Sequence, residues 1–288
     1  MIVLCVVLAL VAALGNAAAS VLQRRAAATD LSTSAWGRAA GRFGFVRLRV
    51  WRWGAGLLAL SGAAQALALA AGPLAVVQPV MTTELLFTLV LAAAVFRWPP
   101  GAGTWAAFLA MALGLAAFLL LAGPGGGMDT VPSGRWLVSA VPAVVVSAAL
   151  IFVGMRRKGS ARAAVLGTVT AIGFSFTAAL IKDTLGLLPE GLGEVFTAWQ
   201  LYTAAAVGLG SFLLLQATLR AGSLAASQPA LTLGDSLLSV ILGVSLFDES
   251  ISLGWRVLPE LASLGLIAFA CVHLSRSPLV SGKEAQRW

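Results

Sequence analysis

Long apolar stretches, each bounded by charged residues, Gly or Pro, alternate with short polar segments along the whole chain. A helix needs about 20 predominantly apolar residues to cross the hydrocarbon core of a bilayer. The roughly ten-residue alternation that marks transmembrane β-strands is absent from the sequence. The pattern therefore predicts an all-α polytopic membrane protein with nine transmembrane helices, at approximately 2–23, 53–71, 73–96, 104–122, 136–155, 163–181, 195–217, 221–247 and 256–274.

The composition of the chain indicates the same surroundings. Its 288 residues are 59% hydrophobic and 10% charged, and the mean hydropathy is +0.95. A soluble domain has about 25% charged residues, so lipid is the expected solvent here. The net charge of +8 does not indicate a surface for nucleic acid, because the basic residues lie between apolar spans.

The basic residues also predict the orientation of the chain. If the N-terminus is outside, the inner segments hold 16 Lys and Arg residues, and the outer segments hold only Arg135, Lys182 and Arg256. Cytoplasmic loops are enriched in Lys and Arg. We therefore expect a multi-pass protein of the cell membrane with its N-terminus outside and its C-terminus in the cytoplasm.

The first span and the basic loop after it need separate interpretation. No basic residue precedes the first apolar run, so we expect a retained helix and not a cleaved signal peptide. Within the inner loop 24–52, cations and aromatic rings alternate, which favours contact of residues 38–53 with anionic lipid headgroups. A tenth span within 24–52 stays open, as does a homodimer.

Two stretches 150 residues apart share residues that are scarce elsewhere in the chain. AGPLAVVQPVMTTELLF at 71–87 returns as AGSLAASQPALTLGDSL at 221–237. The shared features are a Gln-Pro pair, a Thr three residues after the Pro, and a distant Trp. The identical pairs are Ala71/Ala221, Gly72/Gly222, Leu74/Leu224, Ala75/Ala225, Gln78/Gln228, Pro79/Pro229, Thr82/Thr232, Val90/Val240 and Trp105/Trp255.

The two copies cross the membrane in opposite directions, because they lie in the third and the eighth span. Inverted repeats of this kind are typical of secondary transporters. We predict a first repeat of spans one to four over 1–122, and a region 136–274 that holds span five and the second repeat of spans six to nine. Residues 275–288 form a cytoplasmic tail. The layout is thus four helices followed by five.

Pro79 and Pro229 interrupt the helix in both copies. Because proline has no N–H group, the carbonyl groups of Ala75 and Ala225 lose their usual helical partners. Inside a membrane such freed groups must be satisfied by side chains, water or neighbouring helices. One interpretation is a purely structural kink. The other, favoured by the matching Gln and Thr neighbours, is a bend beside a shared cavity.

Glu84 and Asp235 place carboxyl groups near the middle of spans three and eight. An acid at the centre of a membrane helix costs about 2.5–3.5 kcal/mol on insertion scales, so it faces protein or water and marks a candidate functional site. A neutral acid held by a neighbouring hydroxyl group is the alternative. An ideal helix turns Glu84 about 120° away from Gln78, whereas Asp235 lies on a polar stripe with Gln228, Thr232, Ser236 and Ser239.

Further polar residues in the spans are candidates to line the same pathway. We expect a central site among spans one to three and six to eight. Its candidate residues for substrate binding or coupling are Asp235, Glu84, Gln78, Gln228, Thr82, Thr232, Ser236, Asn16 and Gln65, with Pro79 and Pro229 as bending points. Lys182 and Asp183, at the end of span six, are expected to form only an interfacial pair.

The sequence contains no motif of a known catalytic or metal centre. HExxH, GxSxG and the GxxxxGK[ST] phosphate loop are all missing. Cys5 and Cys271 lie in apolar spans and are expected to be small buried residues. We therefore predict no enzyme, no cofactor and no metal cluster, and any transport would depend on gradients or exchange.

The stretches AGPLAVVQPV and AGSLAASQPALTLGDSLLSVILGVSLFDESISLGW resemble the drug/metabolite transporter superfamily, in particular its EamA-like members. The four-plus-five layout, the GNAAASVLQRRAA end of span one and the basic loop after it are most similar to the NIPA-like branch. Two features depart from the superfamily. Arg97-Trp98-Pro99-Pro100 replaces the acidic turn of the second half, and nine spans replace the usual ten.

The resemblance implies a central cavity and gradient-driven transport, with the substrate left open. The expected function is secondary transport of a small metabolite or drug-like solute by alternating access, with H⁺ as a candidate coupling ion. Mg²⁺ transport is an alternative, since relatives are associated with that ion, and a non-transporting membrane scaffold or lipid-interacting protein is another.

Overall fold

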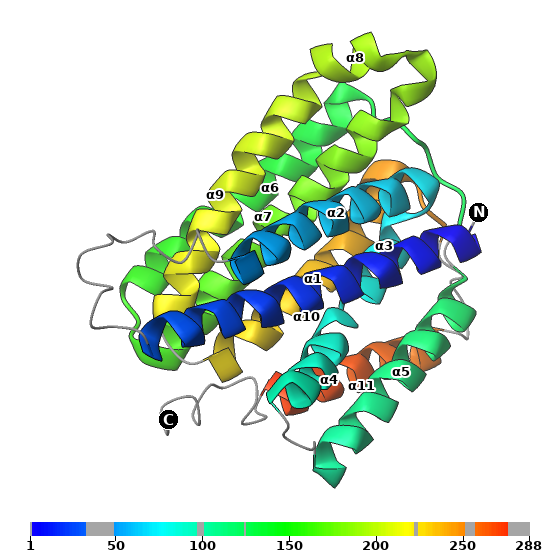
Figure 1. Cartoon of the computed structure of the whole chain (residues 1–288). Helices are drawn as coiled ribbons and strands as arrows, with labels where there is room; N and C mark the ends of the chain where they lie inside the picture. The colour runs from blue at the N-terminus through cyan, green and yellow to red at the C-terminus, as the bar shows by residue number, and fades with distance from the viewer. Residues whose placement is uncertain are drawn as a thin grey trace.

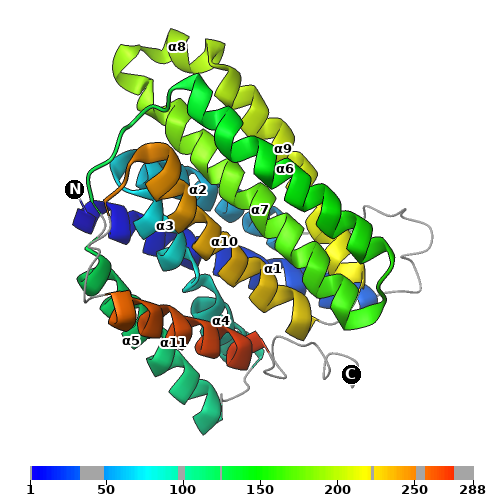
Figure 2. The same ribbon diagram turned by 180° about the vertical axis from the view of Figure 1, so that it is seen from behind.

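The computed structural model describes residues 2–32, 49–96, 101–123, 125–221, 224–250 and 257–275. These residues fold into helices joined by short connections (Figures 1 and 2). The elements are α1 Ile2–Ser32, α2 Arg49–Ala71, α3 Leu74–Met81, α4 Glu84–Phe96, α5 Ala102–Ala122, α6 Ser133–Met155, α7 Gly159–Gly186, the 3₁₀-helix Leu188–Glu190, α8 Leu192–Thr197, α9 Trp199–Ala221, α10 Leu224–Phe247 and α11 Val257–Ser275.

Eight segments of the described chain are long and apolar enough to cross a membrane. They confirm the prediction of a multi-pass helical membrane protein, and they coincide with the first eight predicted spans. The ninth predicted span corresponds to α11, whose apolar part, Leu258–His273, is shorter. The predicted lipid contact at 38–53 and the tenth span in 24–52 fall mostly on residues outside the described ranges.

The predicted start of span seven at residue 195 is wrong. The backbone of Ala198 is extended (φ −65°, ψ 126°) and separates α8 from α9, which begins at Trp199. Gly191, with φ 125°, precedes α8 and adopts a conformation that favours glycine. The polar segment before Trp199 therefore forms a separate short helix and does not extend the span.

The helices pack as close pairs and as contacts between the two halves of the chain. α1 packs along α2, and α7 packs along α9. α3 and α4 both contact α1, while α10 contacts α7. Between the halves, α3 packs on α10 and α5 on α11; Figure 2 shows the α5–α11 pair set apart from α6, α7 and α9.

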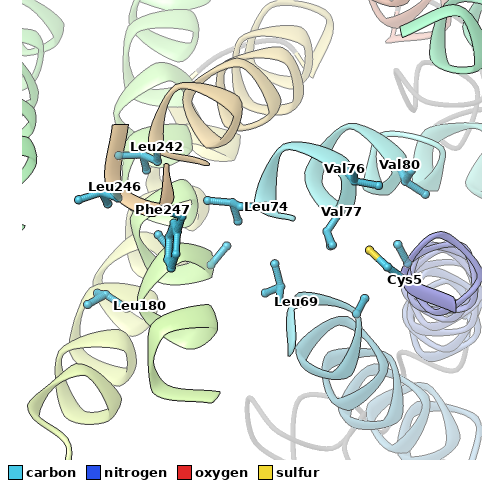
Figure 3. Packing of buried hydrophobic residues seen from close by; sticks show 14 of the residues in the cluster. Cys5, Leu69, Leu74, Val76, Val77, Val80, Leu180, Leu242, Leu246 and Phe247 are labelled. Carbon is cyan, nitrogen blue, oxygen red and sulfur yellow. The ribbon is translucent and has the colours of Figure 1, made fainter. Parts of the chain in front are cut away.

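The main hydrophobic core lies where α1, α2, α3, α7 and α10 meet. Cys5, Leu69, Val77, Leu180 and Phe247 belong to this core, and each comes from a different one of the five helices (Figure 3). Large apolar side chains also cover the outside of the molecule, most clearly on α6, where Val138, Val144 and Val145 are exposed. A water-facing surface would not carry so many, so these side chains face lipid.

The third predicted span is interrupted. α3 ends at Met81, α4 begins at Glu84, and Thr82 and Thr83 form a turn between them. The two threonine hydroxyl groups donate to the carbonyl groups of Pro79 and Val80, both at 2.7 Å. These short-range bonds satisfy backbone acceptors near the break, as an irregular segment inside a membrane requires. Its counterpart α10 continues as one helix through Pro229.

Candidate functional site: a polar cavity between the two halves

A cavity of about 900 Å³ lies among helices of both halves. It is lined by spans one to three and six to eight, the spans in which the sequence places the site. Eight of the nine candidate residues line it: Asn16, Gln65, Gln78, Thr82, Glu84, Thr232, Asp235 and Ser236. The side chain of the ninth, Gln228, lies outside the described part of the chain.

Glu84 is held from the first helix. Asn16 of α1 donates from Nδ2 to Glu84 Oε2 at 3.2 Å, and its Oδ1 accepts from the Ser61 hydroxyl group of α2 at 2.7 Å. The Ser61 oxygen also lies 2.5 Å from the carbonyl oxygen of Ala12. One chain of hydrogen bonds therefore joins α2, α1 and α4 and fixes the position of the Glu84 carboxyl group.

Asp235 is held in a corresponding way in the second half. The hydroxyl group of Ser175, on α7, lies 2.8 Å from Asp235 Oδ1 and donates to it. Ser175 is completely buried and also lies 2.9 Å from the carbonyl oxygen of Ala171. In each half, a carboxyl group on one helix is thus bound by a polar side chain on the helix that packs against it.

A close glycine contact accompanies each of these carboxyl groups. A Cβ atom on Gly15 would lie 3.0 Å from Ser61 Cβ, and one on Gly173 would lie 3.1 Å from Ser211 Cβ. Both contacts join the first and second helices of a half, α1 with α2 and α7 with α9. Each glycine lies one or two residues before the side chain that binds the carboxyl group, Asn16 or Ser175.

The break between α3 and α4 explains why Glu84 reaches the cavity. A continuous ideal helix would direct Glu84 about 120° away from Gln78. In the structure both residues line the same cavity, because the turn at Thr82–Thr83 changes the course of the chain between them. Helical periodicity in the sequence therefore cannot predict the relative directions of two side chains on opposite sides of such a break.

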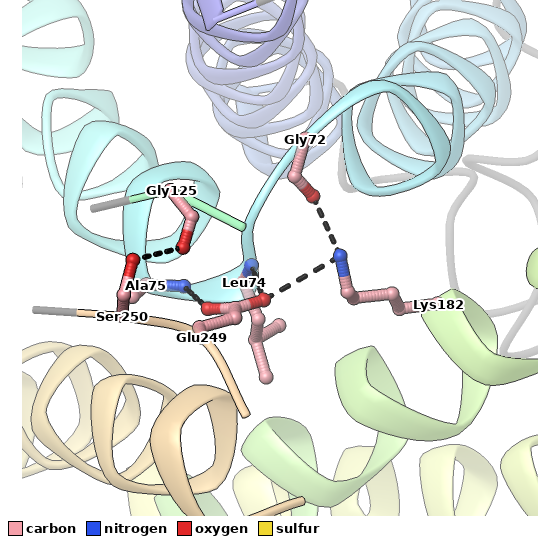
Figure 4. A network of polar contacts seen from close by, with 7 residues as sticks. All are labelled: Gly72, Leu74, Ala75, Gly125, Lys182, Glu249 and Ser250. Atoms are coloured by element: carbon pink, nitrogen blue, oxygen red, sulfur yellow. Dashed lines mark hydrogen bonds and ion pairs between the residues drawn. The ribbon is translucent and has the colours of Figure 1, made fainter. Parts of the chain in front are cut away.

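The prediction for Lys182 and Asp183 is wrong. Both side chains are buried, and each binds other groups instead of its neighbour. Lys182 Nζ donates to the carbonyl oxygen of Gly72 at 2.8 Å and lies 3.4 Å from Glu249 Oε1. The Glu249 carboxylate in turn accepts from the backbone N–H groups of Leu74 and Ala75 at 2.6 and 2.9 Å (Figure 4).

Asp183 binds a second set of donors. Its carboxylate accepts from the backbone N–H of Val131 at 2.7 Å, Trp136 Nε1 at 2.9 Å and Gln200 Nε2 at 3.1 Å. These donors come from the connection before α6, from α6 itself and from α9. Asp183 therefore ties three segments together at the end of α7.

The sequence interpretation missed Ser61, although the repeat contains a signal for it. Ser61 and Ser211 are identical residues at the same 150-residue offset as the Gln-Pro pairs. Glu260, buried in the first turn of α11, was also missed, and its Oε1 has no hydrogen-bond partner among the described residues. Glu260 does not line the cavity.

The cysteines and the other metal-binding side chains do not form a centre within the described chain. Cys5 and Cys271 are buried and free, and they belong to different hydrophobic clusters. Among the described residues no three His, Cys, Asp or Glu side chains gather where they could hold a metal ion. In the described part of the cavity, the acidic groups are the pair Glu84 and Asp235.

Comparisons with known proteins identify a distant relative but no family. No protein-family model matches the chain, and no solved structure matches it. An uncharacterized protein of Corynebacterium glutamicum is 27% identical over 217 residues, a match that covers 74% of each chain. The similarity extends over about three quarters of the chain and carries no information on activity.

Proposed function

We propose that the protein is a secondary transporter that moves a small organic solute across the cell membrane by alternating access. The binding site is the cavity between the two halves. One observation carries the proposal: each half supplies a carboxyl group, Glu84 or Asp235, that is bound by the neighbouring helix and lines the same cavity. A membrane scaffold needs no cavity that is lined by two carboxyl groups.

The pattern of helix packing supports two related halves. α1–α2 corresponds to α7–α9, and the contact of α1 with α3 and α4 corresponds to that of α7 with α10. The two most extensive contacts between the halves, α3 with α10 and α5 with α11, each join a helix to its own counterpart. A two-fold axis produces such pairs. α6 has no counterpart, which fits its place as an additional helix at the edge.

The order of the spans supports an inverted relationship. α3 and α4 form the third span and α10 the eighth, so the two run in opposite directions if every span crosses the membrane. Exchange of conformation between inverted halves converts an outward-open site into an inward-open one. With the basic loops in the cytoplasm, the N-terminus lies outside and the protein belongs in a bacterial-type cytoplasmic membrane.

The contact between Lys182 and Glu249 supports a closed outer end. Lys182 directly follows the cavity residue Ile181, and Gly72 lies three residues beyond the cavity residue Leu69. The contact joins α7 and the end of α10 to the turn before α3, and so connects the halves at one end of the cavity. In the proposed orientation this end is outside, and it must separate before a solute can enter or leave there.

These features together fit the drug/metabolite transporter superfamily that the sequence resembles, and we assign the chain to it as part of the proposal. The carboxyl groups of Asp235 and Glu84 are the candidates for proton coupling. Asp235 is the stronger candidate because it lies on the polar stripe of α10 with the cavity residues Thr232 and Ser236.

Alternating access can be tested without knowledge of the solute. A Thr232→Cys variant places a thiol in the cavity, and membrane-impermeant maleimide is applied to right-side-out and inverted vesicles. We expect labelling mainly from the cytoplasmic side. Adding Glu249→Gln, which removes the carboxylate beside Lys182, is expected to increase labelling from the outside.

Two controls make the result interpretable. The unmodified chain contains two cysteines, both buried, and sets the background. Thr197→Cys, an exposed residue at the end of α8, should be labelled from the outside in every background. Labelling of Thr232→Cys from one side only, unchanged by Glu249→Gln, would contradict alternating access.

A further inference from the structure

We infer that the cavity binds an amphipathic organic cation, whose positive group contacts the free carboxyl oxygens of Glu84 and Asp235 and whose apolar body lies against the hydrophobic wall. This inference rests on the proposed function, since it names the substrate class of the same cavity. It draws on the charge of the lining residues, their unfilled hydrogen-bonding capacity and the shape of the space.

The charge of the cavity is one-sided. Among its described lining residues, Glu84 and Asp235 are acidic and none is Lys, Arg or His. Lys182, although adjacent in sequence to the lining residue Ile181, is directed to Gly72 and Glu249. A phosphorylated or carboxylated solute would find no cationic partner on these residues, whereas a cation finds two acidic groups.

The polar groups of the cavity retain capacity for a ligand. Within the described chain, each carboxyl group has one hydrogen-bonded oxygen, Oε2 of Glu84 and Oδ1 of Asp235, and its other oxygen has no partner. Gln78 also lines the cavity, and its side-chain amide can both donate and accept hydrogen bonds. The unbound carboxyl oxygens and this amide group are therefore polar groups that a ligand in the cavity can bind.

The remaining wall fits an apolar body. Leu69, Met81, Phe174, Ile181 and Leu215 are among the lining residues. A volume of about 900 Å³ is within the range of pockets that enclose drug-sized molecules, and Phe174 is an aromatic residue of the lining. A hydrated Mg²⁺ ion would use only the oxygen atoms and leave this hydrophobic wall in contact with water.

The test compares two probes of the same shape and opposite charge. Tetraphenylphosphonium and tetraphenylborate are titrated into the purified full-length protein in detergent, with protein-free micelles as the blank. We expect the phosphonium to bind at least tenfold more tightly than the borate. Equal binding of the two ions, tighter binding of the borate, or no binding of either would overturn the inference.

Variants locate the binding site. Glu84→Gln and Asp235→Asn should each weaken phosphonium binding, and together they should weaken it at least tenfold. Glu194→Gln, the same loss of charge at an exposed position on α8, is the matched control and should bind like the unmodified protein. Unchanged binding in the double variant, or displacement of the phosphonium by millimolar MgCl₂ but not by NaCl at equal ionic strength, would overturn the inference.

The outcomes also separate this inference from the transport proposal. If the protein binds the phosphonium selectively but Thr232→Cys is not labelled from both sides, the cavity is a cation site and the transport proposal is wrong. If Thr232→Cys shows alternating labelling but both probes bind equally, the protein is a transporter whose solute belongs to another chemical class.

Discussion

Lys182 Nζ lies 3.4 Å from Glu249 Oε1, and both side chains are almost completely buried. α3 begins after Pro73, which has no side-chain group to cap the helix. The Glu249 carboxylate, from beyond the end of α10, caps it instead by accepting from Leu74 and Ala75. One carboxylate therefore serves both as the partner of a buried lysine and as the cap of a helix in the other half.

Removal of either charge should destabilise the protein. Glu249→Gln leaves the Lys182 ammonium group buried without an anion, and Lys182→Met leaves the carboxylate without its cation. Breaking a buried ion pair costs about 3–5 kcal/mol. We expect each variant to unfold at a lower temperature in detergent, as measured by the loss of ellipticity at 222 nm.

The double variant distinguishes an ion pair from general sensitivity of this region. If the charges stabilise each other, Lys182→Met combined with Glu249→Gln should lose less stability than the sum of the single losses. Strictly additive losses would show that the two charges do not interact energetically, and they would weaken the case for this contact as the outer closure.

Gly114→Ala should loosen the pair α5–α11. A Cβ atom on Gly114 would lie 3.0 Å from the carbonyl oxygen of Ser263 and 3.2 Å from the backbone nitrogen of Ile267. Backbone atoms cannot rotate away as a side-chain tip can, so we expect a loss of about 1–3 kcal/mol from overpacking. Thermal unfolding in detergent measures it.

The matched control lies on the partner helix. A Cβ atom on Gly265 of α11 would meet no atom within 4 Å, so Gly265→Ala should be neutral or slightly stabilising. Equal effects of the two substitutions would mean that α5 and α11 do not pack closely at Gly114.

The spans and the cavity residues are accessible to sequence reasoning because membrane insertion imposes strong constraints. A charged or amide side chain within a membrane helix has few places to lie, so the positions of Asn16, Gln65, Glu84 and Asp235 within apolar spans are enough to indicate an internal chamber. The Gln-Pro repeat then predicts that the two halves are related. Neither signal depends on knowing how the helices pack. The polar residues are identified within single spans, and the repeat is identified by comparing two spans.

The contacts of Lys182, Asp183 and Glu249 are not predictable in this way. Each lies near a predicted span end, where a charged residue has an inexpensive default position in the headgroup layer. Lys182 and Glu249 bind backbone groups just before and at the start of α3, which lie 110 and 175 residues away along the chain, and Asp183 binds the connection before α6, 52 residues away. Only tertiary packing brings those backbone groups to the charges.

Asp183→Asn should weaken the attachment of α6. Asparagine keeps the size of the side chain, but its NH₂ group would face donors that include Val131 N–H and Trp136 Nε1–H. A hydrogen bond to a charged group contributes about 1.5–3 kcal/mol, so we expect a clear fall in the unfolding temperature.

Asp248→Asn is the control for this change. Asp248 is exposed and pairs with Arg135 at 2.6 Å, and asparagine tolerates its positive φ of 52°. Exposed ion pairs contribute at most about 1 kcal/mol, so this variant should unfold close to the unmodified protein. An equal loss in both variants would contradict a special role for Asp183.

Asp235→Asn should impair transport more than Glu84→Gln. Asp235 lines the cavity with Thr232 and Ser236 along one uninterrupted helix, whereas Glu84 lies at the start of α4, directly after the break. If Asp235 exchanges a proton, uptake of a phosphonium solute by proteoliposomes should depend on the pH gradient in the unmodified protein. That dependence should vanish in Asp235→Asn and persist in Glu84→Gln. Expression and elution from a sizing column should match in all three proteins. Full uptake with unchanged pH dependence in both variants would remove both acids from coupling.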